Sequence, residues 1–415
     1  MSHSHGPDHT SGPGGMHNNN TNNSNNTSLP GVAQPSPPVV LTPALLESLK
    51  VSKIFKDNTQ IITSIHFDDT GSKCVTSAQD ESLHVYDCYT GKLEKTLFSK
   101  KYGVNLARFT HRSTSVVYAS TKEDDTLRYL SLHDNKYIRY FRGHEKRVTS
   151  LEMSPLDDQF LAGSQDVVRL WDLRSPNCQG VLSVMGQPVV AFDPSGLVFA
   201  VALGGMLRLY DVKSFDQGPF STAMIGESLG IQHTSIYATQ IEFSSDGKSL
   251  LVTTGSDGHF IVDAYTPSIT MFKLVGHNNN TYGSEAFTSG SEACWTPDGK
   301  CVVSGSRDGD IFVWDISRAI ADQAAGQVNG SGANSNNSSS GGGTPNGSSG
   351  NLLQANGELR PFKTLKAHGT PSHIVAFNPK YLMMVSGSTE LAFWEPDQNA
   401  AVVDALHDFS KGGRY

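Results

Sequence analysis

A similar unit occurs seven times between Phe67 and Trp394. In each copy an apolar residue precedes a turn, and 17 to 21 residues later an aromatic or apolar residue, in most copies followed by an acid, closes the unit. The openers are Phe67, Phe109, Met153, Phe192, Phe243, Trp295 and Phe377, and the closers are Tyr86, Leu130, Trp171, Tyr210, Val262, Trp314 and Trp394. Because a unit of this length cannot bury its apolar face alone, the copies must stack on one another, and such stacks usually form binding surfaces.

Each unit is predicted to contain four short strands. In the third unit these are residues Arg147–Met153, Phe160–Ser164, Val168–Trp171 and Cys178–Val184, separated by turns rich in Ser, Pro, Asp and Gly. Pro presets φ at such turns and Gly accepts a positive φ, so the repeated turn chemistry supports the assignment. Seven four-stranded units predict an all-β, seven-bladed β-propeller.

The last unit has no good fourth strand of its own. After Trp394 and Glu395 the sequence becomes polar and rich in small residues, whereas the apolar stretch Val51–Phe55, ahead of the first opener, belongs to no unit. We therefore predict that Val51–Phe55 pairs with Leu391–Trp394. This pairing would close the ring and remove two exposed sheet edges.

Two kinds of composition divide the chain. Residues 1–42 are mostly Asn, Ser, Gly, Pro and His and are predicted to be a disordered tail, and residues 397–415 are predicted to be a second tail. The propeller is expected to span 43–396. A similar Asn/Ser/Gly stretch at about 319–357 separates the last two openers by 82 residues and is interpreted as a surface loop, because a flexible insertion costs little.

Composition excludes several classes of function. The net charge of −8 argues against broad, sequence-independent attraction to nucleic acid or anionic lipid. Five scattered cysteines without a CxxC pair indicate reduced thiols and no zinc site, and the histidines of the first tail are interpreted as solvated, so neither a metal nor a cofactor is expected. No phosphate loop, nucleophile elbow or HExxH motif is present, so no catalytic residue is assigned, and no apolar run predicts a membrane span.

Dipeptides at fixed places in the units resemble those of the WD-repeat family of β-propellers. Trp171-Asp172 and Trp314-Asp315 close third strands, and Gly143-His144 and Gly276-His277 open units. The resemblance implies a buried hydrogen-bonded set of four side chains, for which the best match is His144, Ser164, Asp166 and Trp171. His368 with Trp394 is a partial match.

Positive charge is concentrated in one part of the chain. Residues 92–147 contain 13 Lys and Arg against 6 Asp and Glu. In a propeller, the loops that join one unit to the next lie on one face, so Lys100, Lys101 and Tyr102 are expected to neighbour Lys146 and Arg147 of the following loop. These side chains suit a phosphorylated or acidic peptide. A solvated face balanced by Glu123, Asp124 and Asp125 is the alternative, and the sequence leaves it open.

Longer stretches resemble the WD repeat-containing protein 82 family, the WD-repeat subunits of COMPASS-type histone methyltransferase complexes. They are KKYGV from Lys100, RYLSLHDNKYIRYFRGHEKRV from Arg128, RLWDLRSPNCQG from Arg169, SFDQGPF from Ser214 and AFWEP from Ala392. The resemblance covers about residues 44–396 and is densest in the second to fourth units.

This resemblance implies a nuclear adaptor without catalysis of its own. Its expected partners are a SET-domain methyltransferase subunit, other COMPASS subunits and the phosphorylated C-terminal repeats of RNA polymerase II. Phosphatase and cleavage/polyadenylation factors of transcription termination are further expected partners. An RNA-contacting subunit of a cleavage/polyadenylation complex is the alternative, in which the basic residues meet phosphodiesters. A propeller hydrolase would instead need acids that converge in the central channel.

Overall fold

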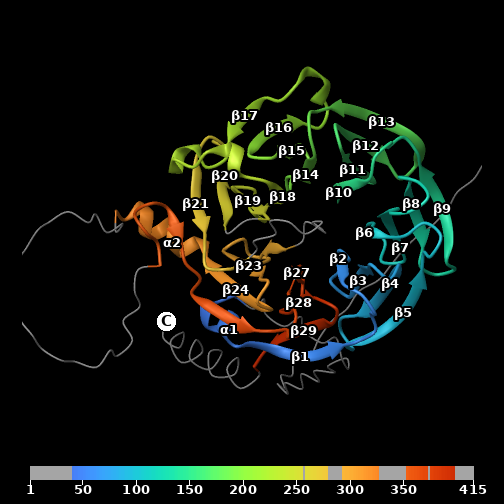
Figure 1. Cartoon of the computed structure of the whole chain (residues 1–415), viewed down its shortest axis with the longest axis horizontal. Coiled ribbons are helices and arrows are strands. Elements are labelled where there is room, and N and C mark those ends of the chain that lie inside the picture. Colours follow the sequence, from blue (N-terminus) through green and yellow to red (C-terminus); the bar gives the residue numbers. More distant parts are fainter. Residues whose placement is uncertain (1–39, 256–257, 279–291, 327–351, 373, 398–415) are drawn as a thin grey trace, which may run out of the picture. The chain divides into compact units, whose positions relative to one another are not determined.

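The computed structural model describes residues 40–255, 258–278, 292–326, 352–372 and 374–397. These residues form seven sheets, six of four strands and one of five. The sheets, numbered here as blades 1 to 7, are arranged in a ring (Figure 1). The predicted seven-bladed β-propeller is therefore confirmed.

In each of blades 1 to 3 the four strands are consecutive in sequence, and each strand pairs with the next one along the chain. Their strands are β2 (Ile62–Phe67), β3 (Lys73–Ala78), β4 (Ser82–Asp87) and β5 (Lys92–Phe98) in blade 1, β6 (Asn105–Phe109), β7 (Ser115–Ala119), β8 (Leu127–Ser131) and β9 (Lys136–Phe141) in blade 2, and β10 (Val148–Met153), β11 (Gln159–Ser164), β12 (Val167–Asp172) and β13 (Ser175–Ser183) in blade 3.

Blades 4 to 6 follow the same order, with extra elements in the last two. Their strands are β14 (Pro188–Phe192), β15 (Val198–Leu203), β16 (Met206–Asp211) and β17 (Ser221–Met224) in blade 4, β18 (Ala238–Phe243), β19 (Ser249–Thr254), β20 (His259–Asp263), β21 (Thr270–Leu274) and β25 (Glu358–Leu359) in blade 5, and β22 (Ala293–Trp295), β23 (Cys301–Gly305), β24 (Asp310–Asp315) and β26 (Lys363–Lys366) in blade 6. Short 3₁₀ turns at Phe215–Gln217, Glu227–Leu229 and His233–Ser235 flank β17.

The repeat spacing correctly predicted where the inner and third strands of each blade lie. Each opener is the last residue of an innermost strand, and each closer lies in the third strand of its blade. In blade 3 the predicted fourth strand began at Cys178, whereas β13 begins three residues earlier at Ser175. The spacing thus reports the distance between inner and third strands, which short turns hold nearly constant.

Blade 7 is built from two distant parts of the chain. It contains β27 (Ile374–Phe377), β28 (Met384–Gly387), β29 (Leu391–Pro396) and, as its outer strand, β1 (Leu49–Phe55), which pairs antiparallel with β29. Val51 pairs with Trp394 and Phe55 with Leu391. The predicted ring closure is confirmed. Helix α1 (Pro43–Glu47) precedes β1, and Thr42 caps it by accepting a hydrogen bond from the Leu45 N–H.

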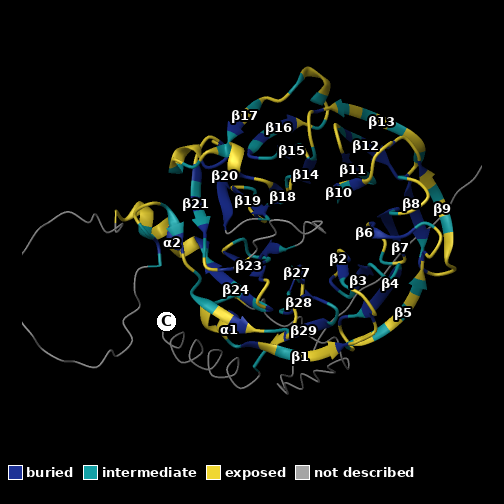
Figure 2. Ribbon diagram, in the orientation of Figure 1, coloured by how far each residue is buried: buried dark blue, intermediate teal, exposed yellow. Residues whose placement is uncertain are grey.

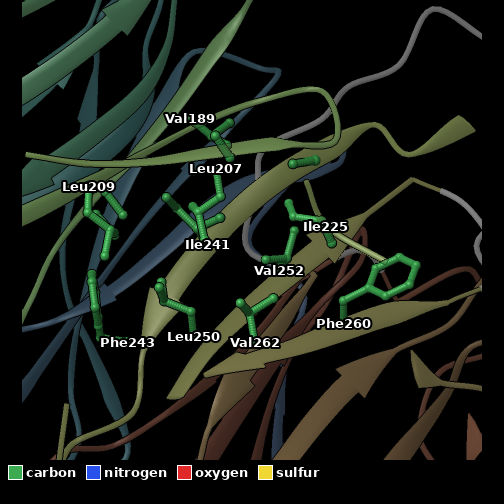
Figure 3. Close-up of a cluster of buried hydrophobic side chains, with 14 of the residues drawn as sticks. Val189, Leu207, Leu209, Ile225, Ile241, Phe243, Leu250, Val252, Phe260 and Val262 are labelled. Atoms are coloured by element: carbon green, nitrogen blue, oxygen red, sulfur yellow. The ribbon is translucent and has the colours of Figure 1, made fainter. Parts of the chain in front are cut away.

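Apolar side chains pack between neighbouring sheets. The described residues form seven hydrophobic clusters, one at each interface between successive blades. Figure 3 shows the cluster between blades 4 and 5, where Leu207 and Leu209 of β16 face Ile241 and Leu250 of β18 and β19. Buried residues fill the inner strands, whereas the outer strands β5, β9 and β13 alternate with exposed residues (Figure 2).

The predicted insertion differs from the structure at both of its edges. Residues 319–324, expected in a loop, complete helix α2 (Ile316–Ala324), because Asp315 caps its first turn and Ile316 and Ala319 are buried between blades 5 and 6. At the other edge Leu353, also expected in the loop, is buried between blades 5 and 6 and forms a β-bridge with Leu359 of β25, which adds to blade 5 as a parallel strand beside β21. The rest of the insertion, 327–351, and the predicted tails at 1–39 and 398–415, with their histidines, lie outside the described residues.

Candidate partner-binding surface

The predicted buried set in blade 3 forms only in part. His144 Nδ1 lies 2.8 Å from Ser164 Oγ, and the His144 and Trp171 ring centroids are 6.2 Å apart. Asp166, however, is exposed at a positive φ of 67°, and its carboxylate accepts a hydrogen bond from the Gly186 N–H. Asp166 was therefore wrongly included, because the tight turn directs its side chain to the next loop.

Burial keeps His144 neutral. Desolvation, with a smaller contribution from the nearby charge of Arg169, lowers the pKa of His144 to about 4. A neutral imidazole can share a hydrogen bond with the Ser164 hydroxyl without a buried charge. The histidine thus has a structural role between blades 2 and 3.

A more complete set forms in blade 7, which the sequence matched only in part. His368 Nε2 lies 2.7 Å from Ser386 Oγ, and the Trp394 Nε1–H donates to the same oxygen at 2.8 Å. In blade 3 the Trp171 Nε1–H has no hydrogen-bond partner among the described residues. The connected histidine, serine and tryptophan therefore occur in the blade that closes the ring.

The loop between β5 and β6 carries the first group of predicted binding residues. Lys100 and Lys101 are exposed and Tyr102 is half-buried. The loop backbone is held by the Gly103 N–H, which donates to the Ser99 carbonyl at 2.7 Å, and by two N–H groups of residues 121 and 122, which donate to the Tyr102 carbonyl. The two lysines are thus carried on a fixed loop.

Arg128 fixes the ring of Tyr102 from inside the blade. Its guanidinium carbon is 3.7 Å from the Tyr102 ring centroid, and its two terminal nitrogens donate to the two carboxylate oxygens of Asp124 at 2.8 and 2.9 Å. These hydrogen bonds lower the pKa of Asp124. Asp124 therefore neutralises Arg128, and does not balance the exposed lysines as the solvated-face alternative assumed.

A row of aromatic rings connects this loop to the next one. The Tyr102 and Tyr137 centroids are 6.5 Å apart, those of Tyr137 and Tyr140 are 5.3 Å apart, and the Arg142 guanidinium carbon is 5.3 Å from the Tyr140 ring. Arg142 and Tyr140 lie at the end of β9, where the second loop begins. Sequence reasoning counted Arg142 in the basic region without assigning it a role.

Lys146 and Arg147 lie farther along the second loop. Both are exposed and follow the buried His144, but no contact joins either of them to Lys100, Lys101 or Tyr102 within the described part of the chain. The two loops are consecutive as predicted, since both join an outer strand to the next inner strand. It is Tyr140 and Arg142 that connect them.

We call seven residues of these two loops and of the end of β9 the basic loop surface: Lys100, Lys101, Tyr102, Tyr140, Arg142, Lys146 and Arg147. Within the described ranges none of its five cations forms an ion pair, although the chain has an excess of acidic residues. Unpaired cations beside aromatic rings offer charge-assisted hydrogen bonds and an apolar platform. The arrangement suits an anionic group on an extended peptide or nucleotide chain.

The innermost strands and their ends carry ionisable residues that sequence reasoning did not single out. Desolvation raises the pKa of Glu152 and of Glu292 to about 7, and that of Glu242 to about 8. Two of them accept hydrogen bonds across the blade 5 and 6 boundary, Glu242 from the Trp295 N–H at 3.3 Å and Glu292 from the Thr239 hydroxyl at 3.4 Å. These carboxyls therefore connect inner strands of neighbouring blades.

All five cysteines are free. Across the ranges that the structure describes, no group of three or more His, Cys, Asp or Glu is placed to hold a metal ion. None of the described helices is long and apolar enough to cross a membrane.

Comparison with known proteins assigns the repeats. The family described as "WD domain, G-beta repeat" matches residues 49–87, 135–172 and 273–315. The second match covers most of blade 3 with β9, and the first covers β1 and three strands of blade 1. The repeat type inferred from the Trp-Asp and Gly-His dipeptides is therefore confirmed.

Three relatives are similar over most of the chain. "WD repeat-containing protein 82" of Drosophila melanogaster is 39% identical over 363 residues, which cover 86% of this chain and 98% of the relative. "Set1 complex component swd2" of Schizosaccharomyces pombe is 38% identical, with 86% and 99% covered. "COMPASS component SWD2" of Saccharomyces cerevisiae is 33% identical over 344 residues, with 81% and 91% covered. The chain therefore belongs to the WD-repeat protein family that includes WD repeat-containing protein 82 and Swd2.

Proposed function

We propose that this protein is a non-catalytic scaffold subunit of a COMPASS-type histone methyltransferase complex and acts in the nucleus. The observation that carries the proposal is similarity over 81–86% of the chain to two proteins named as components of the Set1 and COMPASS complexes. A rigid ring with many exposed loops suits a scaffold, because each loop can hold a different partner. The expected partners are the SET-domain methyltransferase subunit and other COMPASS subunits.

We further propose that the basic loop surface binds the phosphorylated C-terminal repeats of RNA polymerase II. Such binding would direct histone methylation to transcribed genes, and would also serve transcription termination with phosphatase and cleavage/polyadenylation factors. The support is the set of unpaired cations that flanks the aromatic row from Tyr102 to Tyr140. Phosphoserine carries up to two negative charges and three acceptor oxygens, which exposed Lys and Arg can bind directly.

Membership of the complex is tested by affinity purification of the tagged full chain from nuclear extract, followed by mass spectrometry. We expect SET-domain methyltransferase and other COMPASS subunits to be recovered in near-stoichiometric amounts. Recovery of cleavage/polyadenylation factors without any methyltransferase subunit would contradict the scaffold proposal and favour the termination role. A tagged, unrelated WD-repeat propeller is the control for nonspecific capture.

The peptide-binding role is tested separately by titrating a serine-phosphorylated polymerase repeat peptide against the wild type and the Lys100→Glu/Lys146→Glu variant. We expect the variant to bind at least about tenfold more weakly, since it replaces two attractive charges with two repulsive ones. The matched control is Lys213→Glu/Lys248→Glu, which makes the same charge change at exposed sites of blades 4 and 5. Equal affinity of all three proteins would remove the basic loop surface from the site.

Single variants distinguish the two halves of the surface. Arg142→Glu should weaken binding more than Lys146→Glu if the peptide lies along the aromatic row, because the Arg142 guanidinium lies against the Tyr140 ring at the end of that row. RNA of the same length is tested in parallel. Steeply salt-dependent RNA binding, with no preference for the phosphorylated over the unphosphorylated peptide, would favour the RNA-contacting alternative.

A further inference from the structure

A second surface lies at the seam where blade 7 meets blade 1 (Figure 1). A hollow of about 380 Å³ opens there, and its walls include Tyr89, Tyr381, Leu382, Met383, Glu395 and Pro396. Tyr89 belongs to the turn between β4 and β5, and Tyr381 to the loop between β27 and β28. In antiparallel sheets these connections lie at the opposite end of the blades from the basic loop surface, so the two surfaces are separate.

Hydrogen bonds hold both loops of this seam hollow in place. The Asn378 side-chain N–H donates to a backbone carbonyl of blade 1 at 2.7 Å, and its oxygen accepts from the Tyr381 N–H at 2.8 Å. In blade 1 the Asp87 carboxylate accepts from the Thr90 N–H at 2.7 Å and so closes the turn that contains Tyr89. The walls are therefore formed before any partner binds.

The two phenol rings of the seam hollow are open to solvent. Tyr89 is 83% exposed and Tyr381 is 43% exposed, whereas Met383 in the same wall is buried. Within the described ranges neither phenol ring contacts another aromatic ring or a cation. The face of an aromatic ring carries partial negative charge, so two open rings attract a cation.

The charge of the wall has the same preference. Glu395 is the only charged residue among the described residues that line the hollow, and it is exposed. Its cross-strand neighbour in β1, Lys50, forms an ion pair with Asp397 at 3.0 Å. No ion pair joins Glu395 to any residue that the structure describes. Its carboxylate is therefore available to a cation from outside the chain.

Further negative charge lies near the wall. Burial raises the pKa of Cys88, another wall residue, to about 12, and the nearby charges of Asp68 and Asp87 add to the shift. The thiol is therefore neutral. Neither aspartate has an ion-pair partner in the described part of the chain, so their charge is not cancelled. The seam hollow thus combines open aromatic faces with uncompensated negative charge.

Among protein cations, a guanidinium group suits this combination best. It is planar, so it can stack on a phenol ring while its N–H groups donate to a carboxylate. An ammonium group is more strongly hydrated and has no flat face. The hollow, at about 380 Å³, lies within the range of about 300–1,000 Å³ typical of ligand pockets, so it has room for one long side chain and part of its neighbour.

We propose that the seam hollow binds an arginine side chain of a partner protein. The guanidinium group contacts the rings of Tyr89 and Tyr381 and donates hydrogen bonds to the carboxylate of Glu395. An apolar residue next to the arginine packs on Leu382 and Pro396. The propeller then holds anionic partners at one end and a cationic partner at the other. This inference does not rest on the proposed complex or on the peptide-binding role.

Methyl NMR of the full chain, labelled with ¹³C-methyl methionine, tests the proposal, because Met383 lies in the wall. The probe is a capped peptide of the sequence glycine-leucine-arginine-leucine-glycine. We expect a saturable shift of the Met383 signal with a Kd of about 1 mM or below. Met224 of β17, in blade 4, is the internal control and should not shift. The same peptide with citrulline in place of arginine keeps the shape without the charge, and should bind at least about fivefold more weakly.

Variants of the wall identify the groups that bind the arginine. Glu395→Gln and Tyr381→Ala should each weaken binding of the arginine peptide at least about fivefold. Lys380→Gln removes a charge of the opposite sign from the loop of Tyr381 and should bind no more weakly than the wild type. Asp216→Asn, at an exposed site of blade 4, makes the same kind of change as Glu395→Gln and should have no effect.

Several outcomes would overturn the proposal. They are equal binding of the arginine and citrulline peptides, wild-type affinity in both wall variants, and the absence of any Met383 shift. A Met383 shift on dilution of the wild type without peptide would identify a second copy of the chain as the occupant. Peptide binding that requires deletion of residues 398–415 would identify the chain's own C-terminal segment as the occupant, and either result would also overturn the proposal.

Discussion

Blades 3 and 7 contain the same three residue types in the same order, yet only blade 7 connects all three. In blade 7 the side chains of His368 and Trp394 both form hydrogen bonds with the hydroxyl of Ser386. In blade 3 the hydroxyl of Ser164 forms a hydrogen bond with His144 only, and the indole N–H of Trp171 has no partner among the described residues. The blade that matches the WD pattern better in sequence therefore has the weaker network.

Strand register explains the difference. Trp394 pairs with Met384, and Ser386, two residues farther on, lies on the same face of β28. In blade 3 Trp171 pairs with Phe160, so the residue that corresponds to Ser386 is Ala162, and Ser164 corresponds to Ser388. A hydroxyl in the correct position, and not the presence of a serine in the motif, decides whether the network forms.

The largest effect is expected where blade 7 depends on a distant part of the chain. Deleting residues 49–55 removes β1, exposes the edge of β29 and uncovers Phe393 and Trp394 in the closing cluster. We expect loss of soluble folded protein, because β29 loses its antiparallel partner and presents an unpaired edge. Deleting residues 1–39 should leave the thermal unfolding temperature nearly unchanged, and equal effects of the two deletions would contradict closure by β1.

The second prediction converts blade 7 to the arrangement of blade 3. Ser386→Ala leaves both the Trp394 N–H and the His368 nitrogen without the hydroxyl, and we expect the free energy of unfolding to fall by about 3 kcal/mol. Ser164→Ala, the matched variant, removes one bond and should cost about 1 kcal/mol. Urea denaturation measures both, and equal losses would mean that the indole bond of Trp394 contributes nothing.

These contacts show which features the sequence could predict. The positions of the strands follow from turn residues and apolar spacing, and the closing strand follows from the missing fourth strand of blade 7. Whether Ser164 or Ala162 occupies the position beside Trp171 depends on the length of the turn between β11 and β12, and a sequence motif does not fix that length. The stacking of Arg128 on Tyr102 joins strand β8 to the loop between β5 and β6, and α2 needed the burial of Ile316, so neither was evident from local composition.

The third prediction concerns acid sensitivity. His144 titrates at about pH 4 in the folded chain but near 6.5 when unfolded, so below pH 6.5 the unfolded chain binds a proton that the folded chain does not. Stability is therefore lost as pH falls, by about 2 kcal/mol at pH 5 relative to neutral pH. In blade 7 the pKa of His368 is also lowered by burial, but the charge of Glu390 opposes the shift.

Urea denaturation at pH 7.5 and pH 5 measures the loss of stability that His144 causes, as a difference between variants. His144→Asn should lose less stability between the two pH values than the wild type, and His368→Asn should differ less from the wild type than His144→Asn does. The subtraction removes the contribution of the carboxyl groups, which titrate in all three proteins. A pH-dependent loss in His144→Asn equal to that of the wild type would show that His144 does not account for the acid sensitivity.

The smallest effect is expected from a substitution that introduces into blade 3 a hydroxyl at the position that Ser386 occupies in blade 7. Ala162→Ser places an oxygen on the face of β11 next to Trp171, where it can accept the indole N–H that has no described partner. We expect a gain of about 1 kcal/mol in the free energy of unfolding and slower exchange of the indole proton by NMR. Ala200→Ser, in β15 of blade 4, is the control, because Ala200 is buried, pairs with Leu209 and lies in the apolar cluster between blades 4 and 5. There an unsatisfied hydroxyl should cost about 1–3 kcal/mol. If Ala162→Ser loses as much as Ala200→Ser, register alone does not explain why the two blades differ.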